Sequence, residues 1–139
     1  MTKTTSDPYA EIERGDGELT IHLFTPPVPA SRPRVSKWGT YYGKTYKAYR
    51  KAAETAIPQT DEPVEGLTRV VVEFICKRPK KTVRRCPAGD IDNHLKSILD
   101  AITRAGYIED DELIVGVKAL KRWAHEGETP HTYIRIIAT

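Results

Sequence analysis

The sequence lacks long apolar runs and has few cysteines, and these two shortages exclude several classes of protein. No apolar stretch approaches the roughly 20 residues that a membrane-spanning helix needs, and the N-terminus has no apolar core of the kind found in signal peptides. The two cysteines, Cys76 and Cys86, show neither a C-x-x-C nor a Cys/His spacing, so we expect free thiols. We therefore expect a cytoplasmic protein without a membrane segment.

The length and charge of the chain point to one small domain whose basic residues act through clustering. Its 139 residues suit a single domain with a modest core, and its net charge of +3 is mild. Residues 1–17 are polar, contain Pro8, Gly15 and Gly17, and show neither helical nor strand periodicity. We expect a flexible N-terminal arm over residues 1–17 and a single domain over residues 18–139.

Hydrophobic periodicity predicts the elements of that domain. Alternating apolar residues indicate strands, and apolar residues at steps of three and four indicate helices. Strands are predicted at residues 18–24, 67–76, 113–119 and 133–138, and helices at residues 46–57 and 93–105. The order β-α-β-α-β-β predicts an α+β fold, in which a small mixed β-sheet of about four strands carries two helices on one side.

Acidic residues gather around the second predicted helix. An apolar stripe defines the buried face of this helix, and Asp92 and Lys96 are neighbours on one flank of the stripe. Asp90 precedes Asp92 by two residues, which is the side-chain period of an extended segment, so both carboxylates can point to the same side. Residues 109–112 form a second acidic cluster, which an antiparallel return of the chain would bring toward the helix start. Asp111 is the favoured member of that cluster.

Clustered carboxylates predict a cation, because they repel one another unless a metal or a shared proton lies between them. Oxygen ligands without a histidine or cysteine partner favour Mg²⁺, with Mn²⁺ as a substitute, over Zn²⁺. The alternative interpretation is a helix cap followed by a solvated acidic turn. A calcium loop beginning at Asp90 is excluded, because its sixth position is Leu95 instead of glycine and its twelfth is Ala101 instead of glutamate.

Two basic segments flank this acidic region in the sequence. The first, residues 77–85, leads directly into Asp90, and the second, residues 31–51, interleaves cations with Trp38 and several tyrosines. Cations can hold phosphates while aromatic rings stack on distorted bases, so both segments predict contacts with nucleic acid. The alternative is that the charges are solvated and the rings pack beneath a loop. The predicted DNA contacts are Arg32, Arg34, Lys37, Lys44, Lys80, Lys81, Arg84 and Arg85.

The acidic motif resembles the signature of the RusA family of Holliday junction resolvases. The matching residues, 90–111, read D-I-D-N-H-L-K-S-I-L-D-A-I-T-R-A-G-Y-I-E-D-D, with Ile102 where the family pattern has leucine. Carried over position by position, the resemblance implies that Asp90, Asp92 and Asp111 are metal-binding catalytic acids. It also implies that Lys96 assists at the scissile phosphate. Secondary candidates in the motif are Asp100 and Asp110.

These observations predict a Mg²⁺-dependent endodeoxyribonuclease that resolves four-way DNA junctions by paired symmetric nicks in recombination and repair. Two nicks in strands related by near two-fold symmetry favour a C2 homodimer, and the resemblance implies the same assembly. We expect such an enzyme to be nucleoid-associated, with a chromosomal or a prophage origin left open. Two alternatives also stay open: a DNA-binding module that does not cleave, and a nuclease that prefers flaps or forks.

Overall fold

The structure, a computed structural model, describes residues 8–31, 34–37, 39–41 and 43–139. Within these residues, five strands form one sheet in the order β1-β2-β7-β5-β6, and two short strands form a separate hairpin. The α+β class is confirmed, with one sheet strand more than expected. The elements are β1 (Tyr9–Gly15), β2 (Glu18–Phe24), β3 (Arg34–Ser36), β4 (Gly39–Tyr41), α1 (Lys44–Ala56), β5 (Thr68–Cys76), α2 (Ile91–Arg104), the 3₁₀-helix η1 (Asp111–Leu113), β6 (Ile114–Trp123) and β7 (His131–Ala138).

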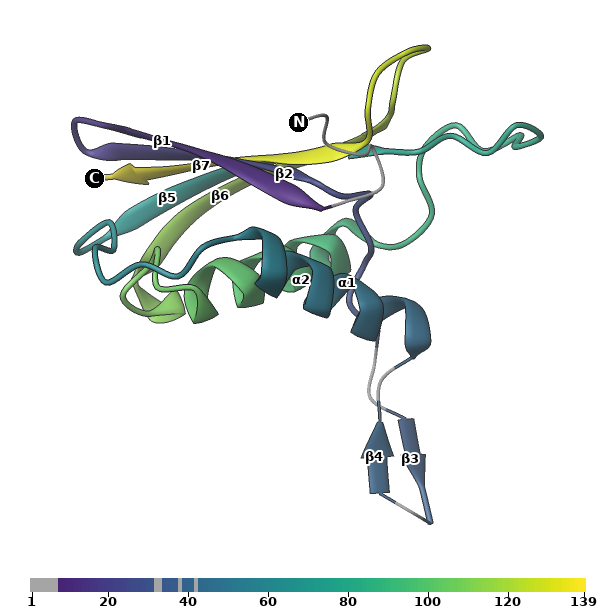
Figure 1. The fold of residues 1–139 in the computed structure, drawn as a ribbon, viewed down its shortest axis with the longest axis horizontal. Coiled ribbons are helices and arrows are strands. Elements are labelled where there is room, and N and C mark those ends of the chain that lie inside the picture. The colour runs from purple at the N-terminus through teal and green to yellow at the C-terminus, as the bar shows by residue number, and fades with distance from the viewer. Residues whose placement is uncertain (1–7, 32–33, 38, 42) are drawn as a thin grey trace, which may run out of the picture.

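Both helices cover the same face of the sheet, so the core lies between a helix layer and a sheet layer (Figure 1). Alternate residues of the central strands point into this core, among them Ile21, Val72 and Ile134, each with no exposed surface. The helices contribute their own apolar stripes, of which Ala53 and Ile98 are fully buried. None of the helices in the described part of the chain is long and apolar enough to cross a membrane.

Strand β1 corrects the expectation of a flexible arm over residues 1–17. Residues 9–15 pair with β2 in an antiparallel hairpin, joined by the two-residue turn at Asp16 and Gly17. The strand was missed because only Ala10 and Ile12 turn apolar side chains toward the core, and Glu11 and Glu13 alternate with them. Its strand conformation therefore depends on pairing with β2, and the Asp-Gly dipeptide was the available hairpin signal. Residues 1–7 lie outside the described residues.

The connection from β5 through α2 to β6 sets the positions of the predicted site residues. Strand β6 runs parallel to β5, whereas the other neighbours in the sheet are antiparallel. A parallel pair requires a crossover, so α2 carries the chain back along the whole length of β5 before β6 begins. The predicted antiparallel return of the acidic cluster is therefore wrong, because the cluster lies at the C-terminal end of α2.

Candidate active site

Asp90 and Asp92 lie at the N-terminus of α2. Asp90 is the N-cap residue, and its carbonyl accepts hydrogen bonds from the backbone amides of Asn93 and His94, both at 3.1 Å. Asp92 falls in the first helical turn, and its Oδ1 accepts a hydrogen bond from the amide of Asn93 at 3.0 Å. Both carboxylates are exposed, and the positive end of the helix dipole favours negative charge at this position.

A groove of about 400 Å³ runs along the outer side of α2. Asp92, Lys96 and Asp100 line it together with Asp111, above a partly apolar wall formed by Leu95 and Leu99. The prediction that Asp92 and Lys96 are neighbours on one flank of the helix is confirmed by their places in this groove. Asp90 is not among the residues that line the groove.

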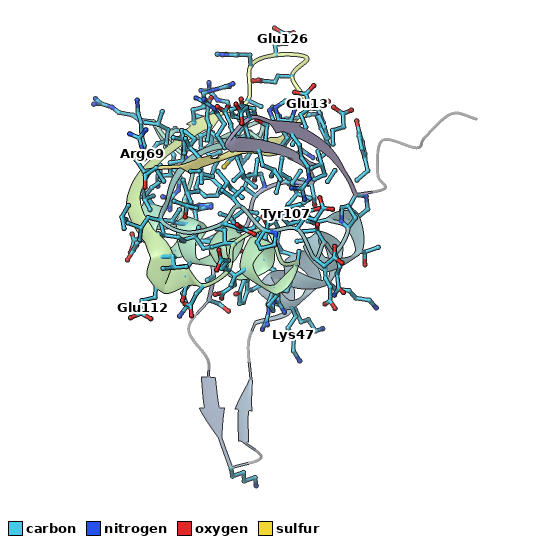
Figure 2. The ribbon with its side chains drawn as sticks, turned by 90° about the vertical axis from the view of Figure 1, so that its left-hand side faces the viewer. Glu13, Lys47, Arg69, Tyr107, Glu112 and Glu126 are labelled. Atoms are coloured by element: carbon cyan, nitrogen blue, oxygen red, sulfur yellow. The ribbon has the colours of Figure 1, made fainter. Side chains whose placement is uncertain are left out.

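Asp111 opens the short helix η1, directly before β6. Its neighbour Asp110 is the N-cap of η1, and Asp110 Oδ1 accepts a hydrogen bond from the amide of Glu112 at 2.9 Å. This backbone hydrogen bond holds the pKa of Asp110 below its ordinary value, and a side-chain hydrogen bond with Asp111 makes a smaller contribution in the same direction. Figure 2 shows Glu112 at the surface, on the helix-layer side of the molecule. Asp110 thus has a capping role, and Asp111 is the member of the cluster that faces the groove.

The two halves of the motif lie at opposite ends of α2. A helix of 14 residues is about 21 Å long, with Asp90 before its first residue and Asp111 beyond the turn that follows its last. The sheet gives the same estimate of the distance between the two acidic groups. Lys121, which contacts Gly89 at one end, pairs with Phe74, and Ile114, which follows η1 at the other end, pairs with Thr68. The six residues from Thr68 to Phe74 span about 20 Å of strand. Accordingly, no group of three acidic, histidine or cysteine side chains among the described residues is arranged to hold a metal ion.

Comparison with known proteins shows the family to which this arrangement belongs. Residues 25–137 match the family described as Endodeoxyribonuclease RusA. The chain belongs to the RusA family. A curated relative, the crossover junction endodeoxyribonuclease rusA of Enterobacteria phage HK97, is 28% identical over 108 residues, which are 74% of this chain and 84% of that protein. The chain is therefore an endodeoxyribonuclease, and the resemblance seen in the acidic motif is confirmed.

Two arginines of this RusA-family chain line the groove although the sequence reasoning did not select them. Helical spacing could have predicted Arg104, because it lies one turn beyond Asp100 on the face of α2 that carries Asp92 and Lys96. Arg50 belongs to α1, where its guanidinium lies 5.7 Å from the ring centre of Tyr46. No sequence spacing relates Arg50 to the motif, because the packing of α1 beside α2 brings it there.

The loop between β5 and α2 and the β3-β4 hairpin, which carry most of the predicted DNA-contact residues that the structure describes, project from the body of this RusA-family domain (Figure 1). Lys80, Lys81, Arg84 and Arg85 are exposed in the loop between β5 and α2, as expected for a segment that contains prolines. The indole Nε1 of Trp123 anchors this loop by donating to the carbonyl of Arg84 at 3.1 Å. In the hairpin, Arg34 begins β3 and Lys37 is exposed, and exposed Lys44 is the first residue of α1. Arg32 lies outside the described residues.

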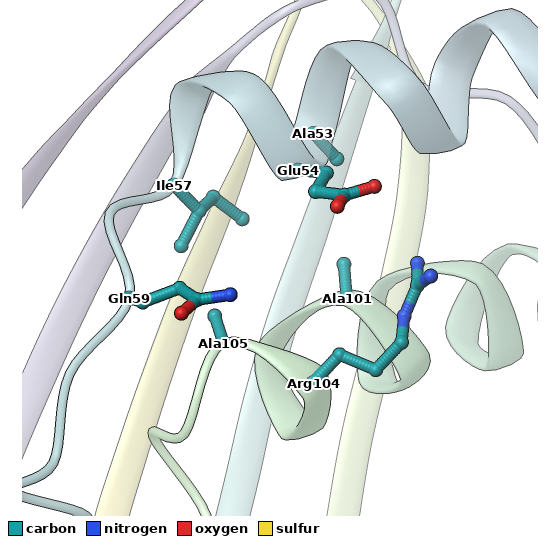
Figure 3. A pocket seen from close by; sticks show the side chains of 7 residues that line it. All are labelled: Ala53, Glu54, Ile57, Gln59, Ala101, Arg104 and Ala105. Carbon is teal, nitrogen blue, oxygen red and sulfur yellow. The ribbon is translucent and has the colours of Figure 1, made fainter.

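A second hollow, of about 290 Å³, lies between the C-terminal halves of α1 and α2 (Figure 3). Its floor consists of small and apolar side chains, including Ala53 and Ala101, and Glu54 faces Arg104 across it. Glu54 is the one carboxylate among the described residues that line it, so it offers no paired acids for a metal. In this chain the groove along α2 is therefore the better candidate for the reaction site.

Proposed function

We propose that this enzyme resolves four-way DNA junctions by Mg²⁺-dependent hydrolysis of phosphodiesters. The observation that carries the proposal is the groove along α2, where Asp92 and Asp111 occur with Lys96, Arg50 and Arg104. Carboxylates for a cation and cations for a phosphate are the two components of metal-assisted phosphoryl chemistry. The phage HK97 relative is named a crossover junction endodeoxyribonuclease, which supports a branched substrate for this chain as well.

The residues present fit Mg²⁺ by the chemistry of their donors. Mg²⁺ is usually held by one or two carboxylates together with waters and substrate phosphates, and exposed Asp90, Asp92 and Asp111 offer such oxygens. When bound, the cation would activate a water and neutralise charge on the phosphate. Asp90, Asp92 and Asp111 would be the ligands that hold it.

The cationic side chains of the groove act on the substrate directly. The ammonium of Lys96 would donate to a non-bridging oxygen of the scissile phosphate and offset the charge that develops there. Arg50 and Arg104 would hold the neighbouring phosphates through bidentate contacts and so orient the strand. The exposed basic residues of the loop before α2 would then extend this contact along a DNA arm.

A homodimer would unite the two acidic halves that one chain keeps apart. A single Mg²⁺ binds oxygens at about 2.1 Å, so its carboxylates must lie far closer together than the length of α2 allows. If two α2 helices face each other antiparallel about a two-fold axis, Asp90 and Asp92 of one protomer meet Asp111 of its partner. This arrangement creates two identical sites, as two symmetric nicks require.

The test is nicking of a labelled synthetic four-way junction, with linear duplex, flap and fork substrates in parallel. We expect paired symmetric nicks from the parent in Mg²⁺ and none in EDTA or from Asp92→Asn. Asp61→Asn, which changes an exposed acid outside the groove, serves as the matched control and should nick like the parent. Binding without cleavage would indicate a recognition module, and preferential cleavage of flaps or forks would change the assigned substrate.

A further inference from the structure

The loop of residues 87–89, which leads into Asp90, is held through three consecutive carbonyl groups. Lys121 Nζ donates to the carbonyl of Pro87 at 2.8 Å and to that of Gly89 at 2.5 Å. The carbonyl between them, of Ala88, lies 3.1 Å from Nε2 of His94. Because a carbonyl can only accept, Nε2 of His94 carries the proton. Two side chains thus fix the backbone immediately before a proposed metal ligand.

Packing fixes the same loop from a third side. Gly89 has a φ of +92°, and a Cβ at this position would lie 2.8 Å from Cγ of Pro29. The amide of Ala30, beside Pro29, donates to the carbonyl of Asn93 at 2.9 Å. The loop therefore contacts the segment before β3, the first turn of α2 and the side chain of Lys121, although Ala88 and Gly89 keep an exposed side.

Lys121 reaches this loop from β6, a different element from those that carry the motif. It pairs with Phe74 in the parallel register, so its side chain points to the helix side of the sheet. Within the described part of the chain, no carboxylate lies within ion-pair distance of Lys121. Its charge is directed to the two carbonyls, and charge-assisted hydrogen bonds of this kind are stronger than neutral ones.

We infer that Lys121 is a positioning residue, which orients Asp90 for metal binding through the carbonyls of residues 87 and 89. This inference rests on the proposed function, because it takes Asp90 as a metal ligand. Residues that orient metal ligands typically affect metal affinity or activity on the order of 10–100-fold when they are changed. A Lys121 that contacted DNA instead would act on junction affinity and its salt dependence.

The test compares Lys121→Met with Lys118→Met. Lys118 lies on the same strand but on the opposite face of the sheet, where it is exposed, so its change removes an equal charge away from the loop. Hydrogen exchange of the Asn93 and His94 amides reports on the loop independently of activity, since both donate to the Asp90 carbonyl. We expect faster exchange in Lys121→Met only, and partial restoration in Lys121→Arg, which keeps donors at this position.

Cleavage then distinguishes positioning from support of the fold. We expect the Mg²⁺ concentration for half-maximal nicking by Lys121→Met to rise, or its kcat to fall, on the order of 10–100-fold, with parental junction affinity in EDTA. A lowered Tm with unchanged exchange and Mg²⁺ dependence would overturn the inference, and so would weakened junction binding as the main effect. If the parent itself does not nick junctions, the proposed function fails, and unchanged exchange would still refute positioning by Lys121.

Discussion

A mixed dimer of two inactive variants tests whether the acidic site is shared between protomers. Asp92→Asn and Asp111→Asn each remove a proposed ligand from opposite ends of α2, which are separated by about 20 Å. In a heterodimer of the two variants, a shared arrangement leaves one site with both changes and one site with neither. An arrangement within each chain leaves a changed ligand in both sites.

The expected activity follows from this count. A heterodimer isolated through two different affinity tags should nick junctions at about half the parental rate, because one of two symmetric sites is intact. An untagged equimolar mixture should retain about a quarter, since about half of randomly formed dimers are mixed. The products should be single nicks without the paired, symmetric second nick of the parent.

Gel analysis of both labelled strand pairs measures the nicking rate and the proportion of single and paired nicks in one experiment. A heterodimer of parent and Asp92→Asn is the positive control, because it keeps one intact site under either arrangement. A double-variant heterodimer as inactive as each variant alone, beside an active control heterodimer, would refute the shared site. The reasoning from the length of α2 would then be wrong, and Asp111 would have to reach Asp92 by rearrangement within one chain.

Three further predictions concern the stability of the fold, its dependence on pH, and the dependence of cleavage on pH and Mg²⁺. Gly106→Ala should lower the free energy of unfolding by more than about 2 kcal/mol and the Tm by at least about 6 °C. The reason is that φ is +96° and a Cβ would clash with the carbonyl oxygen of Thr60. Gly66→Ala, also at positive φ but in open space, should lower the Tm less in the same melting experiment. A hydrogen bond from Arg122 lowers the pKa of Glu128 from 4.5 to about 2, so this carboxylate stabilises the fold above pH 4.5 and loses that effect toward pH 2. The Tm difference between the parent and Glu128→Gln should therefore shrink as the pH falls from 4.5 to 2. A constant difference would contradict the lowered pKa of Glu128. Cleavage should fall in acid as protons compete with metal for the carboxylates, and added Mg²⁺ should move that limb to lower pH; a limb that ignores Mg²⁺ would exclude the competition.

Local patterns predicted most of the helices and strands but not how distant segments meet. The helix expected at residues 93–105 is α2 (Ile91–Arg104), and the strand expected at residues 67–76 is β5 (Thr68–Cys76), because each buries one continuous apolar face. Strand β1 was missed because it has too few apolar residues to show strand periodicity by itself, and its conformation depends on pairing with β2. The order of the elements was also right, apart from this added strand and the β3-β4 hairpin.

The sequence motif selected residues that share one groove, but it did not predict how they are arranged along α2. The motif identified Asp92, Lys96 and Asp111, which line one groove, but an antiparallel return was assumed after α2. The rule that a strand-helix-strand unit forms a parallel pair would have placed Asp111 at the far end of the helix. Arg50 and Lys121 could not be found, because the roles proposed for them rest on contacts between elements that no local spacing describes.

The separation of the acids along α2 also has a consequence for how such an enzyme is controlled. Under the proposed arrangement, a newly synthesised chain has no complete set of ligands, so it cannot cut DNA until it meets a second copy. Below the dissociation constant of the dimer, the number of competent sites then falls with the square of the protein concentration. The length of one helix would thus make cleavage depend on expression level, and dilution alone would protect intact DNA from stray nicks.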